Sequence, residues 1–149
     1  MTSAFPWVEP ARVDHVGVLV SDFTWVERLL AGGMALESSA AERVDEFGVD
    51  LLWIGGLDVP LELICPLDRD SRAGRRLRGR GAGADHIALR VESVEEALAW
   101  CRQAGVAALD PSPRPGSRGT RVAFLDPADT GGLRIELVEH PAAEGGGEA

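Results

Sequence analysis

The sequence lacks any long apolar segment, and this absence limits the kind of protein it encodes. No uninterrupted apolar run approaches the roughly 18 residues that a membrane-spanning helix requires, so we expect no membrane insertion. The first residues, MTSAFPWVEP, have neither a basic start nor an extended apolar stretch, so we expect no secretory signal peptide. Only two cysteines occur, Cys65 and Cys101, too few for a disulfide framework. We therefore expect two reduced thiols and a cytoplasmic protein.

Lysine is also missing, because all 15 basic residues are arginine, a feature that we attribute to genomic bias. The 24 acidic residues bring the net charge to −9, which argues against a nucleic-acid-binding protein. With 149 residues, 45% of them hydrophobic, the chain can form one compact domain or two half-size modules that share a core.

Alternating apolar residues and turn signals predict the element order βαβββ, which then occurs a second time. Predicted helices follow Ser21-Asp22 and Ser93, and glycines end both of them. The predicted strands span residues 13–20, 34–40, 47–55 and 61–65, and then 85–91, 106–110, 121–125 and 133–138. We place the modules at about 13–67 and 84–140, between an N-terminal extension at 1–12 and a disordered tail at 141–149.

The two halves also share sequence. The stretch DHVGVLV begins at Asp14 and corresponds to DHIALRV, which begins at Asp85, at an offset of 71 residues. Likewise LELI at 61–64 corresponds to IELV at 135–138, at an offset of 74 residues. An internal repeat of this length predicts two half-domains around one shared cavity. We expect an α+β fold in which two βαβββ modules form a curved, partly open mixed sheet around a metal site.

Each half contributes one histidine and one glutamate that suit a metal ion. His15 and His86 lie at strand heads, and Glu62 and Glu136 lie within apolar strands, where a carboxylate is costly to bury unless it is paired or bound to a cation. One such histidine alone is more often structural, and one such glutamate alone can lie on an exposed sheet face. The occurrence of both at equivalent repeat positions favours a site for Co²⁺, Mn²⁺, Ni²⁺, Zn²⁺ or Fe²⁺.

These residues lie in stretches that resemble the vicinal oxygen chelate (glyoxalase/bleomycin-resistance/dioxygenase) superfamily, and within it the methylmalonyl-CoA epimerases and related epimerases. The similar stretches are VDHVGVLVSD, LELICPLDRDS, ADHIALRVESVEEAL and RPGSRGTRVAFLDPADTGGLRIELVE. The resemblance implies that His15, Glu62, His86 and Glu136 are the metal ligands. It also implies a homodimer and proton transfer at a carbon alpha to a carbonyl, through an enolate. The substrate would be an acyl-CoA or a cyclic polyol ketone of the 2-epi-5-epi-valiolone type.

For that chemistry the metal ion would act as a Lewis acid on the substrate carbonyl. Epimerisation needs an acid–base group on each face of the enolate, or one group that reaches both. We expect Glu136 to be the catalytic base and Glu62 to be the candidate for the second group. A glyoxalase-type lyase or isomerase with the same four ligands is the alternative. A ring-cleaving dioxygenase would need the coordination position that Glu62 takes, and a non-catalytic binding protein would lack the ligands.

Two segments depart from the epimerase pattern. In FGVDLLW, Leu51 stands where bacterial epimerases have their second acid. In FLDPAD, Asp126 and Asp129 replace a histidine and a lysine, which weakens the assignment to an acyl-CoA. The arginine-rich stretch RDSRAGRRLRGRG either binds the phosphates of CoA or forms a solvated helix face, and we favour the helix face.

Three tryptophans have expected places. Trp25 and Trp100 lie at similar depth in the two predicted helices and are expected to pack in the core. Trp53 has the parity of the inward face of its strand and is a candidate lining residue of the substrate pocket.

Overall fold

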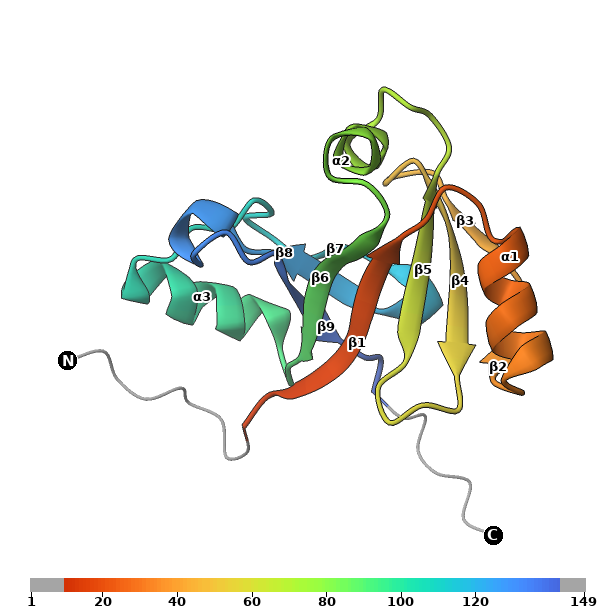
Figure 1. The fold of residues 1–149 in the computed structure, drawn as a ribbon. Coiled ribbons are helices and arrows are strands. Elements are labelled where there is room, and N and C mark those ends of the chain that lie inside the picture. Colours follow the sequence, from red (N-terminus) through yellow and green to blue (C-terminus); the bar gives the residue numbers. More distant parts are fainter. Residues whose placement is uncertain (1–9, 143–149) are drawn as a thin grey trace, which may run out of the picture. The chain divides into compact units, whose positions relative to one another are not determined.

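The structure, a computed structural model, describes residues 10–142 and has the mixed α+β fold that the sequence predicts (Figure 1). It divides into two compact units. Residues 13–88 form the N-terminal unit, and residues 10–12 with 89–142 form the C-terminal unit. The predictions for residues 1–9 and 143–149 lie outside the described residues. Within the described range, no helix is long and apolar enough to cross a membrane.

The N-terminal unit is built on a mixed sheet. Its elements are β1 (Arg12–Leu19), α1 (Thr24–Glu27), the π-helical turn η1 (Arg28–Gly33), β2 (Glu37–Ser38), β3 (Glu42–Val44), β4 (Val49–Gly55), β5 (Leu61–Pro66), α2 (Arg72–Arg80) and β6 (Gly83–Arg90). The strands pair in the order β2-β4-β5-β1-β6, and β3 also pairs with β4. Strand β5 is parallel to β1 and antiparallel to β4, so it lies at the centre of this sheet.

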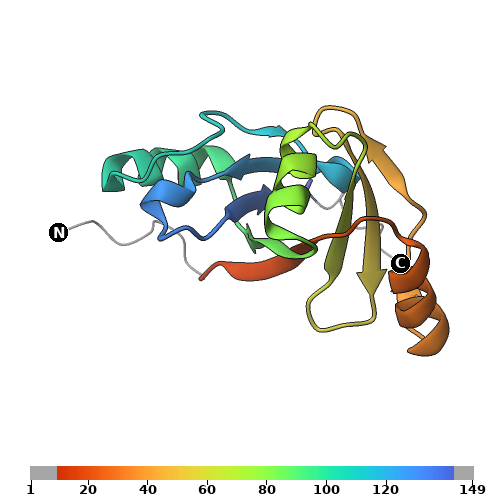
Figure 2. The ribbon, with the colours of Figure 1, turned by 45° about the horizontal axis from the view of Figure 1, so that its top comes forward.

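The two faces of this sheet pack against different helices. The first face buries Leu52, Ile54 and Leu63 against apolar residues of the α1–η1 segment, among them Phe23, Val26 and Leu30. The second face buries Leu19, Val49, Leu51 and Ile64 against Ala73 and Leu77 of α2, and Figure 2 shows α2, in green, beside the strands of its own unit. Side chains alternate along a strand, so His15 shares the second face with Leu19, and Glu62 shares it with Ile64. Helix α2 therefore covers the face that carries predicted metal ligands.

Helix α2 confirms the helical interpretation of the arginine-rich stretch. It begins after Ser71, whose side-chain oxygen accepts a hydrogen bond from the backbone nitrogen of Gly74 at 3.0 Å. Arg75 and Arg78 are exposed, and both bind a residue just before the helix. Arg75 donates to the backbone carbonyl of Asp70 at 2.7 Å, and Arg78 donates to the carboxylate of Asp70 at 3.2 Å. The exposed face of the helix is thus solvated and paired with neighbouring acceptors.

The C-terminal unit is a smaller sheet covered by one long helix. Its elements are α3 (Val94–Ala104), β7 (Arg114–Pro115), η2 (Ser117–Gly119), β8 (Arg121–Phe124), η3 (Pro127–Asp129) and β9 (Ile135–Glu139), with the strand order β9-β8-β7. Ser93 caps α3 by accepting from the backbone nitrogen of Glu96 at 3.2 Å, and Gly105 ends the helix in the left-handed conformation. Val94, Ala97 and Leu98 of α3 are buried in the core of this unit.

Two predicted strands differ in the structure. The strand expected at 106–110 is wrong, because Ala108 makes only an isolated bridge with Leu125. The segment then turns into a proline-containing loop, in which the carboxylate of Asp110 accepts from the backbone nitrogen of Phe124 at 2.9 Å. Between 34 and 40 only the two residues of β2 are extended, and Ala35 has a positive φ of 56° that interrupts the strand.

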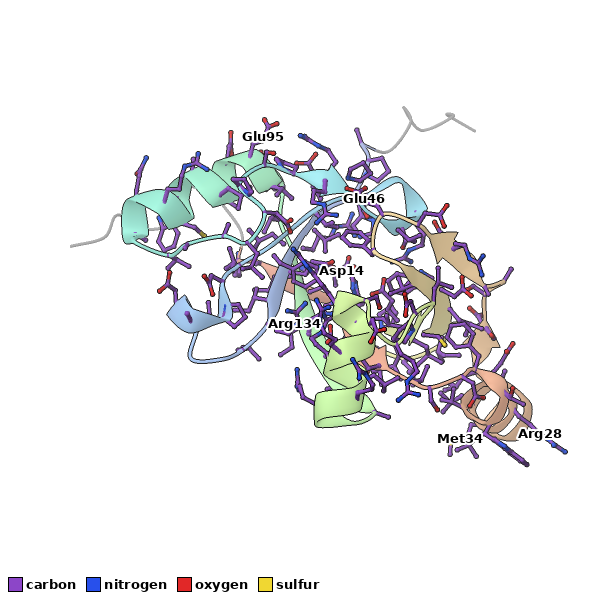
Figure 3. All side chains as sticks on the ribbon, turned by 90° about the horizontal axis from the view of Figure 1, so that it is seen from above. Asp14, Arg28, Met34, Glu46, Glu95 and Arg134 are labelled. Atoms are coloured by element: carbon purple, nitrogen blue, oxygen red, sulfur yellow. The ribbon has the colours of Figure 1, made fainter. Side chains whose placement is uncertain are left out.

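The expectation for Trp25 is also wrong. Its side chain is 71% exposed, and the guanidinium of Arg28 lies 5.4 Å from its ring centroid. The buried side of the segment is formed by Val26 and Leu30 instead, while Arg28 and Met34 project away from the sheet of this unit (Figure 3). Trp100, in contrast, packs against the core of the C-terminal unit, as predicted.

Candidate metal centre

Three of the four predicted ligands lie in the N-terminal unit, on neighbouring strands. His15 is on β1, Glu62 on β5 and His86 on β6, and their exposed fractions are only 3%, 7% and 4%. The register places Gly17 of β1 and Trp53 of β4 on either side of Glu62. The internal repeat therefore predicts correctly that these two histidines lie together with Glu62.

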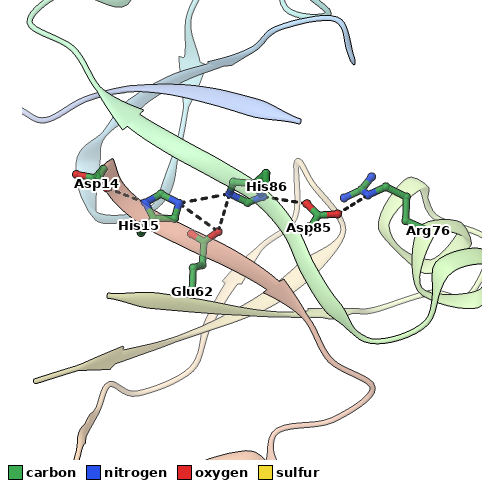
Figure 4. Close-up of polar contacts among 6 residues, drawn as sticks. All are labelled: Asp14, His15, Glu62, Arg76, Asp85 and His86. Atoms are coloured by element: carbon green, nitrogen blue, oxygen red, sulfur yellow. Dashed lines mark hydrogen bonds and ion pairs between the residues drawn. The ribbon is translucent and has the colours of Figure 1, made fainter. Parts of the chain in front are cut away.

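The three side chains direct their ligand atoms at one another (Figure 4). The Nε2 atom of His15 and the Nε2 atom of His86 each lie 3.7 Å from the Oε1 atom of Glu62. The two Nε2 atoms are 3.4 Å apart. Three nitrogen and oxygen donors gathered in a buried space suit a divalent transition metal, which both imidazole and carboxylate bind well.

Each histidine ring is oriented by the aspartate that precedes it in the chain. The Nδ1 atom of His15 lies 2.6 Å from the carboxylate of Asp14, and the Nδ1 atom of His86 lies 2.9 Å from that of Asp85. A carboxylate at Nδ1 favours the tautomer with the proton on Nδ1 and leaves the Nε2 lone pair available for a metal ion. Both Nε2 atoms face Glu62, so the two orientations agree with metal coordination.

Asp85 has a second partner. Its side chain is 1% exposed, and its Oδ1 atom accepts a hydrogen bond from the Nε atom of Arg76 on α2 at 2.8 Å, while its Oδ2 atom faces His86. Burial alone would raise the pKa of Asp85, but the hydrogen bonds from His86 and Arg76 and their charges outweigh it and hold this pKa well below its usual range. Asp85 is therefore a carboxylate between a helix arginine and a predicted ligand.

Gly17 and Trp53 bring the backbone of β1 and an aromatic ring against the two imidazoles. A side chain at Gly17 would meet the ring of His86, because a Cβ atom there would lie 2.1 Å from its Cε1 atom. The edge-on ring of Trp53 lies 4.8 Å from that of His15, centroid to centroid. Trp53 thus borders the predicted ligands, as its strand parity indicates.

Glu136 belongs to the C-terminal unit. It lies in the middle of β9, where its register partner is Phe124 of β8, and it is 7% exposed. A carboxylate this deeply buried within an apolar strand meets the energetic condition that singles it out in the sequence.

The three residues that depart from the epimerase pattern have structural roles. Leu51 is 5% exposed in the apolar cluster under α2. Asp126 accepts from the backbone nitrogen of Ala128 at 2.9 Å and so begins η3, and Asp129 accepts from the backbone nitrogen of Ala107 at 2.8 Å. The two aspartates stabilise the turns around β8 and β9.

Sequence reasoning misses Asp14, Asp85, Arg76 and Gly17 as neighbours of the predicted ligands. The aspartates carry a signal, because the dipeptide Asp-His heads both repeated strands. No sequence signal points to Arg76, since six arginines occur between 69 and 80 and their spacing does not distinguish the one that reaches Asp85.

Comparisons with known proteins agree with this architecture. The family model of the Glyoxalase/Bleomycin resistance protein/Dioxygenase superfamily matches residues 14–124. The Bacillus subtilis protein YqjC is 32% identical over 128 residues, which cover 86% of this chain and 91% of that protein. Human mitochondrial methylmalonyl-CoA epimerase is 28% identical over 127 residues, which cover 85% of this chain and 72% of the human protein. Among solved structures, a variant of Streptomyces coelicolor methylmalonyl-CoA epimerase in complex with 2-nitronate-propionyl-CoA superposes with a TM-score of 0.83 at 30% identity, covering 91% of this chain and 99% of that one.

Proposed function

Because the chain belongs to the glyoxalase/bleomycin resistance protein/dioxygenase superfamily, we propose that it is a divalent-metal-dependent epimerase that acts at the carbon alpha to the carbonyl of an acyl-CoA. The observation that carries the proposal is the convergence of the Nε2 atoms of His15 and His86 on the carboxylate of Glu62. Two of the proteins compared above, from human mitochondria and from Streptomyces coelicolor, are methylmalonyl-CoA epimerases by name, and they support the acyl-CoA substrate class.

In this proposal His15, Glu62, His86 and Glu136 hold the ion. The donor set fits such an ion, since both imidazoles present Nε2 with Nδ1 directed at an aspartate. When bound, a divalent ion such as Co²⁺, Mn²⁺, Ni²⁺, Zn²⁺ or Fe²⁺ supplies a Lewis acid for the substrate carbonyl oxygen.

Glu136 is the proposed base. Its carboxylate takes the proton from the carbon alpha to the carbonyl, the electron pair of the broken C–H bond moves toward the carbonyl oxygen, and an enolate results. Return of a proton to the opposite face of the planar enolate gives the epimer. We assign this return to Glu62 in its protonated form, because Leu51 has no proton to give and is packed in the apolar cluster under α2. Glu136 then loses its proton to solvent and Glu62 regains one from solvent, which restores the starting state.

The acids at 126 and 129 do not oppose an acyl-CoA substrate in this proposal. Asp126 accepts from the backbone nitrogen of Ala128 in its own turn at 2.9 Å, and Asp129 accepts from the backbone nitrogen of Ala107, in the loop after α3, at 2.8 Å. Both carboxylates therefore have a structural role in holding a turn or loop, which explains their presence independently of the substrate. A homodimer remains part of the proposal, as the resemblance implies.

The test begins with metal binding. The purified protein is expected to contain about one transition-metal ion per chain, and added Co²⁺ should raise the melting temperature of the metal-free protein, because a ligand of the native state stabilises it. His15→Ala and His86→Ala should abolish both effects while the chain stays folded. His140→Ala, which changes the third histidine of the chain, is the matched control and should behave as the wild type. Wild-type protein without metal and without a Co²⁺ effect would contradict the proposal.

Deuterium exchange then tests the reaction. In D₂O the wild type should place deuterium at the alpha carbon of methylmalonyl-CoA without O₂ or a nicotinamide. Glu136→Gln keeps the shape and one coordinating oxygen but cannot accept the proton, so exchange should fall by about 10²–10⁴-fold while metal is retained. Exchange into a valiolone-type ketone instead would change the substrate class. Undiminished exchange in Glu136→Gln would move the base to another acid, and activity that depends on O₂ would refute the epimerase.

A further inference from the structure

Arg76 reaches the surroundings of the predicted ligands from a helix, through its contact with Asp85. The other aspartate–histidine pair, Asp14 with His15, lies within β1, whereas Arg76 is on α2, nine residues before Asp85 in the chain. Figure 4 shows the resulting row of side chains, which runs from Arg76 through Asp85 and His86 to Glu62. The row connects a helix to a metal ligand through one buried carboxylate.

Helix α2 is held in place independently of this row. Ala73 and Leu77 on either side of Arg76 pack on Leu19, Val49, Leu51 and Ile64, which lie on the same sheet face as His15 and Glu62. Gly74 allows the close approach of the helix to the preceding turn, because a Cβ atom there would lie 2.1 Å from the carbonyl oxygen of Asp68. The apolar contacts therefore fix where Arg76 stands, and Arg76 in turn has a defined position from which to hold Asp85.

We propose that Arg76 is a positioning residue that, through Asp85, sets the orientation of the His86 imidazole and thereby the affinity and geometry of the metal site. The inference rests on the proposed function, since it requires His86 to be a ligand. Besides Glu62 and His15, which lie near its Nε2 atom, the His86 ring has Asp85 at 2.9 Å from its Nδ1 atom and the backbone of Gly17 beside it, which leaves no space for the ring to move toward β1. Without the hydrogen bond from Arg76, the Asp85 carboxylate would be held less firmly opposite Nδ1, and the orientation of the His86 ring would be less well defined.

Arg76→Met tests this inference, because methionine keeps an unbranched side chain at this partly buried position but has no group that donates to Asp85. Arg78→Met is the matched control on the same helix, since the Arg78–Asp70 pair is exposed, with side chains that are 46% and 82% accessible. Co²⁺ affinity, measured by competition with a chelator, is expected to fall by about 10–100-fold in Arg76→Met, the usual effect of losing a partner of a metal-bound histidine. It should not change in Arg78→Met.

Two further readouts separate positioning from mere stability. The visible absorption spectrum of bound Co²⁺, which reports ligand geometry, should change in Arg76→Met and not in Arg78→Met. In the metal-free protein, the proton NMR signal of the His86 Nδ1–H should be exchange-broadened or shifted in Arg76→Met, because its acceptor has lost the hydrogen bond from Arg76. Arg76→Lys, which keeps a cation, should recover part of the Co²⁺ affinity.

The double variant completes the test. If Arg76 acts only through Asp85, Arg76→Met added to Asp85→Asn should lower the Co²⁺ affinity no further than Asp85→Asn alone. Folded Arg76→Met protein with wild-type Co²⁺ affinity and spectrum would overturn the inference, even if its melting temperature were lower. Wild-type protein that binds no Co²⁺ would instead refute the proposed function and this inference with it, so the two failures are distinguishable.

Discussion

Gly17 provides a direct test of whether the His86 ring must lie where it does. Gly17→Ala adds one methyl group on β1, and its Cβ atom would lie 2.1 Å from Cε1, 2.4 Å from Nδ1 and 2.6 Å from Nε2 of His86. Gly17 is not among the glycines with positive φ, so alanine introduces no backbone strain at this position. The effect of the substitution is therefore steric, and the displaced group is the imidazole of His86.

The displacement can be worked out from van der Waals contact. Two carbon atoms are in favourable contact at about 3.5–4.0 Å, so the ring has to move away from β1 by roughly 1.4 Å or more. Coordination distances in metal sites vary by only about 0.2 Å, and the ring would also leave Asp85, now 2.9 Å from Nδ1. We expect the Co²⁺ affinity of Gly17→Ala to fall by at least about 10–100-fold. The free energy of unfolding of the metal-free protein should fall by about 1–3 kcal/mol, as is usual for an overpacked core.

The assays are a chelator-competition titration with Co²⁺ and urea unfolding of the metal-free protein. Gly79→Ala is the control, because it makes the same chemical change on the exposed side of α2, where nothing lies within 4 Å of the added Cβ atom. It should leave Co²⁺ affinity unchanged and increase the free energy of unfolding by about 0.5–1 kcal/mol, since alanine favours a helix interior over glycine. Wild-type Co²⁺ affinity in Gly17→Ala would refute the reasoning, because it would mean that the ring of His86 is free to move without loss of the site.

Three further predictions concern a helix contact, a helix cap and a partly buried thiol. Gly74→Ala should lower the free energy of unfolding, measured in urea, by about 1–3 kcal/mol, because its Cβ atom would meet the backbone carbonyl of Asp68 at 2.1 Å. An unchanged urea midpoint would show that α2 is not held against this turn. Ser93→Ala removes the acceptor of the Glu96 backbone nitrogen at the start of α3 and should lower the free energy of unfolding by about 1 kcal/mol; equal stability in urea would rule out this cap. Burial, helped by nearby carboxylates, raises the pKa of the Cys65 thiol, so less thiolate is present than in a free cysteine at the same pH. Iodoacetamide labelling of Cys65, followed by mass spectrometry, should therefore have its midpoint above the ordinary pKa of about 8.5, and a midpoint at or below that pH would contradict the assigned environment.

The sequence alone predicts most of the strands and the candidate ligands. Strand alternation places His15 with Leu19 and Glu62 with Ile64, because successive side chains point to opposite faces. In the structure Leu19 and Ile64 lie in one cluster under α2, and His15 and Glu62 face one another. The offset of 71 residues between the two Asp-His dipeptides predicts that His15 and His86 occupy equivalent strands, and their Nε2 atoms lie 3.4 Å apart. The period of two residues is visible in the sequence because every second side chain of such a strand is buried.

Local sequence patterns predict the structure less well where a loop contact or the orientation of a helix determines it. The apolar run at 106–110 has the composition of a strand, yet the following prolines and the anchoring of Asp110 to the backbone nitrogen of Phe124 remove it from the sheet. Trp25 is 71% exposed because the α1–η1 segment buries Val26 and Leu30 instead, and a shift of one residue along a helix turns a side chain by about 100°.

Only the tertiary structure assigns Arg76 to Asp85 and Gly17 to His86. Several arginines of α2 have similar neighbours in the sequence, so the sequence does not distinguish them. Ala73 and Leu77 pack on the sheet, and this packing orients α2 so that Arg76 lies partly buried beside Asp85. Gly17 owes its role to a ring carried by β6, a strand far away in the chain. Contacts of this kind depend on which faces of distant elements meet, and a single sequence records the residues of such a contact without recording that they touch.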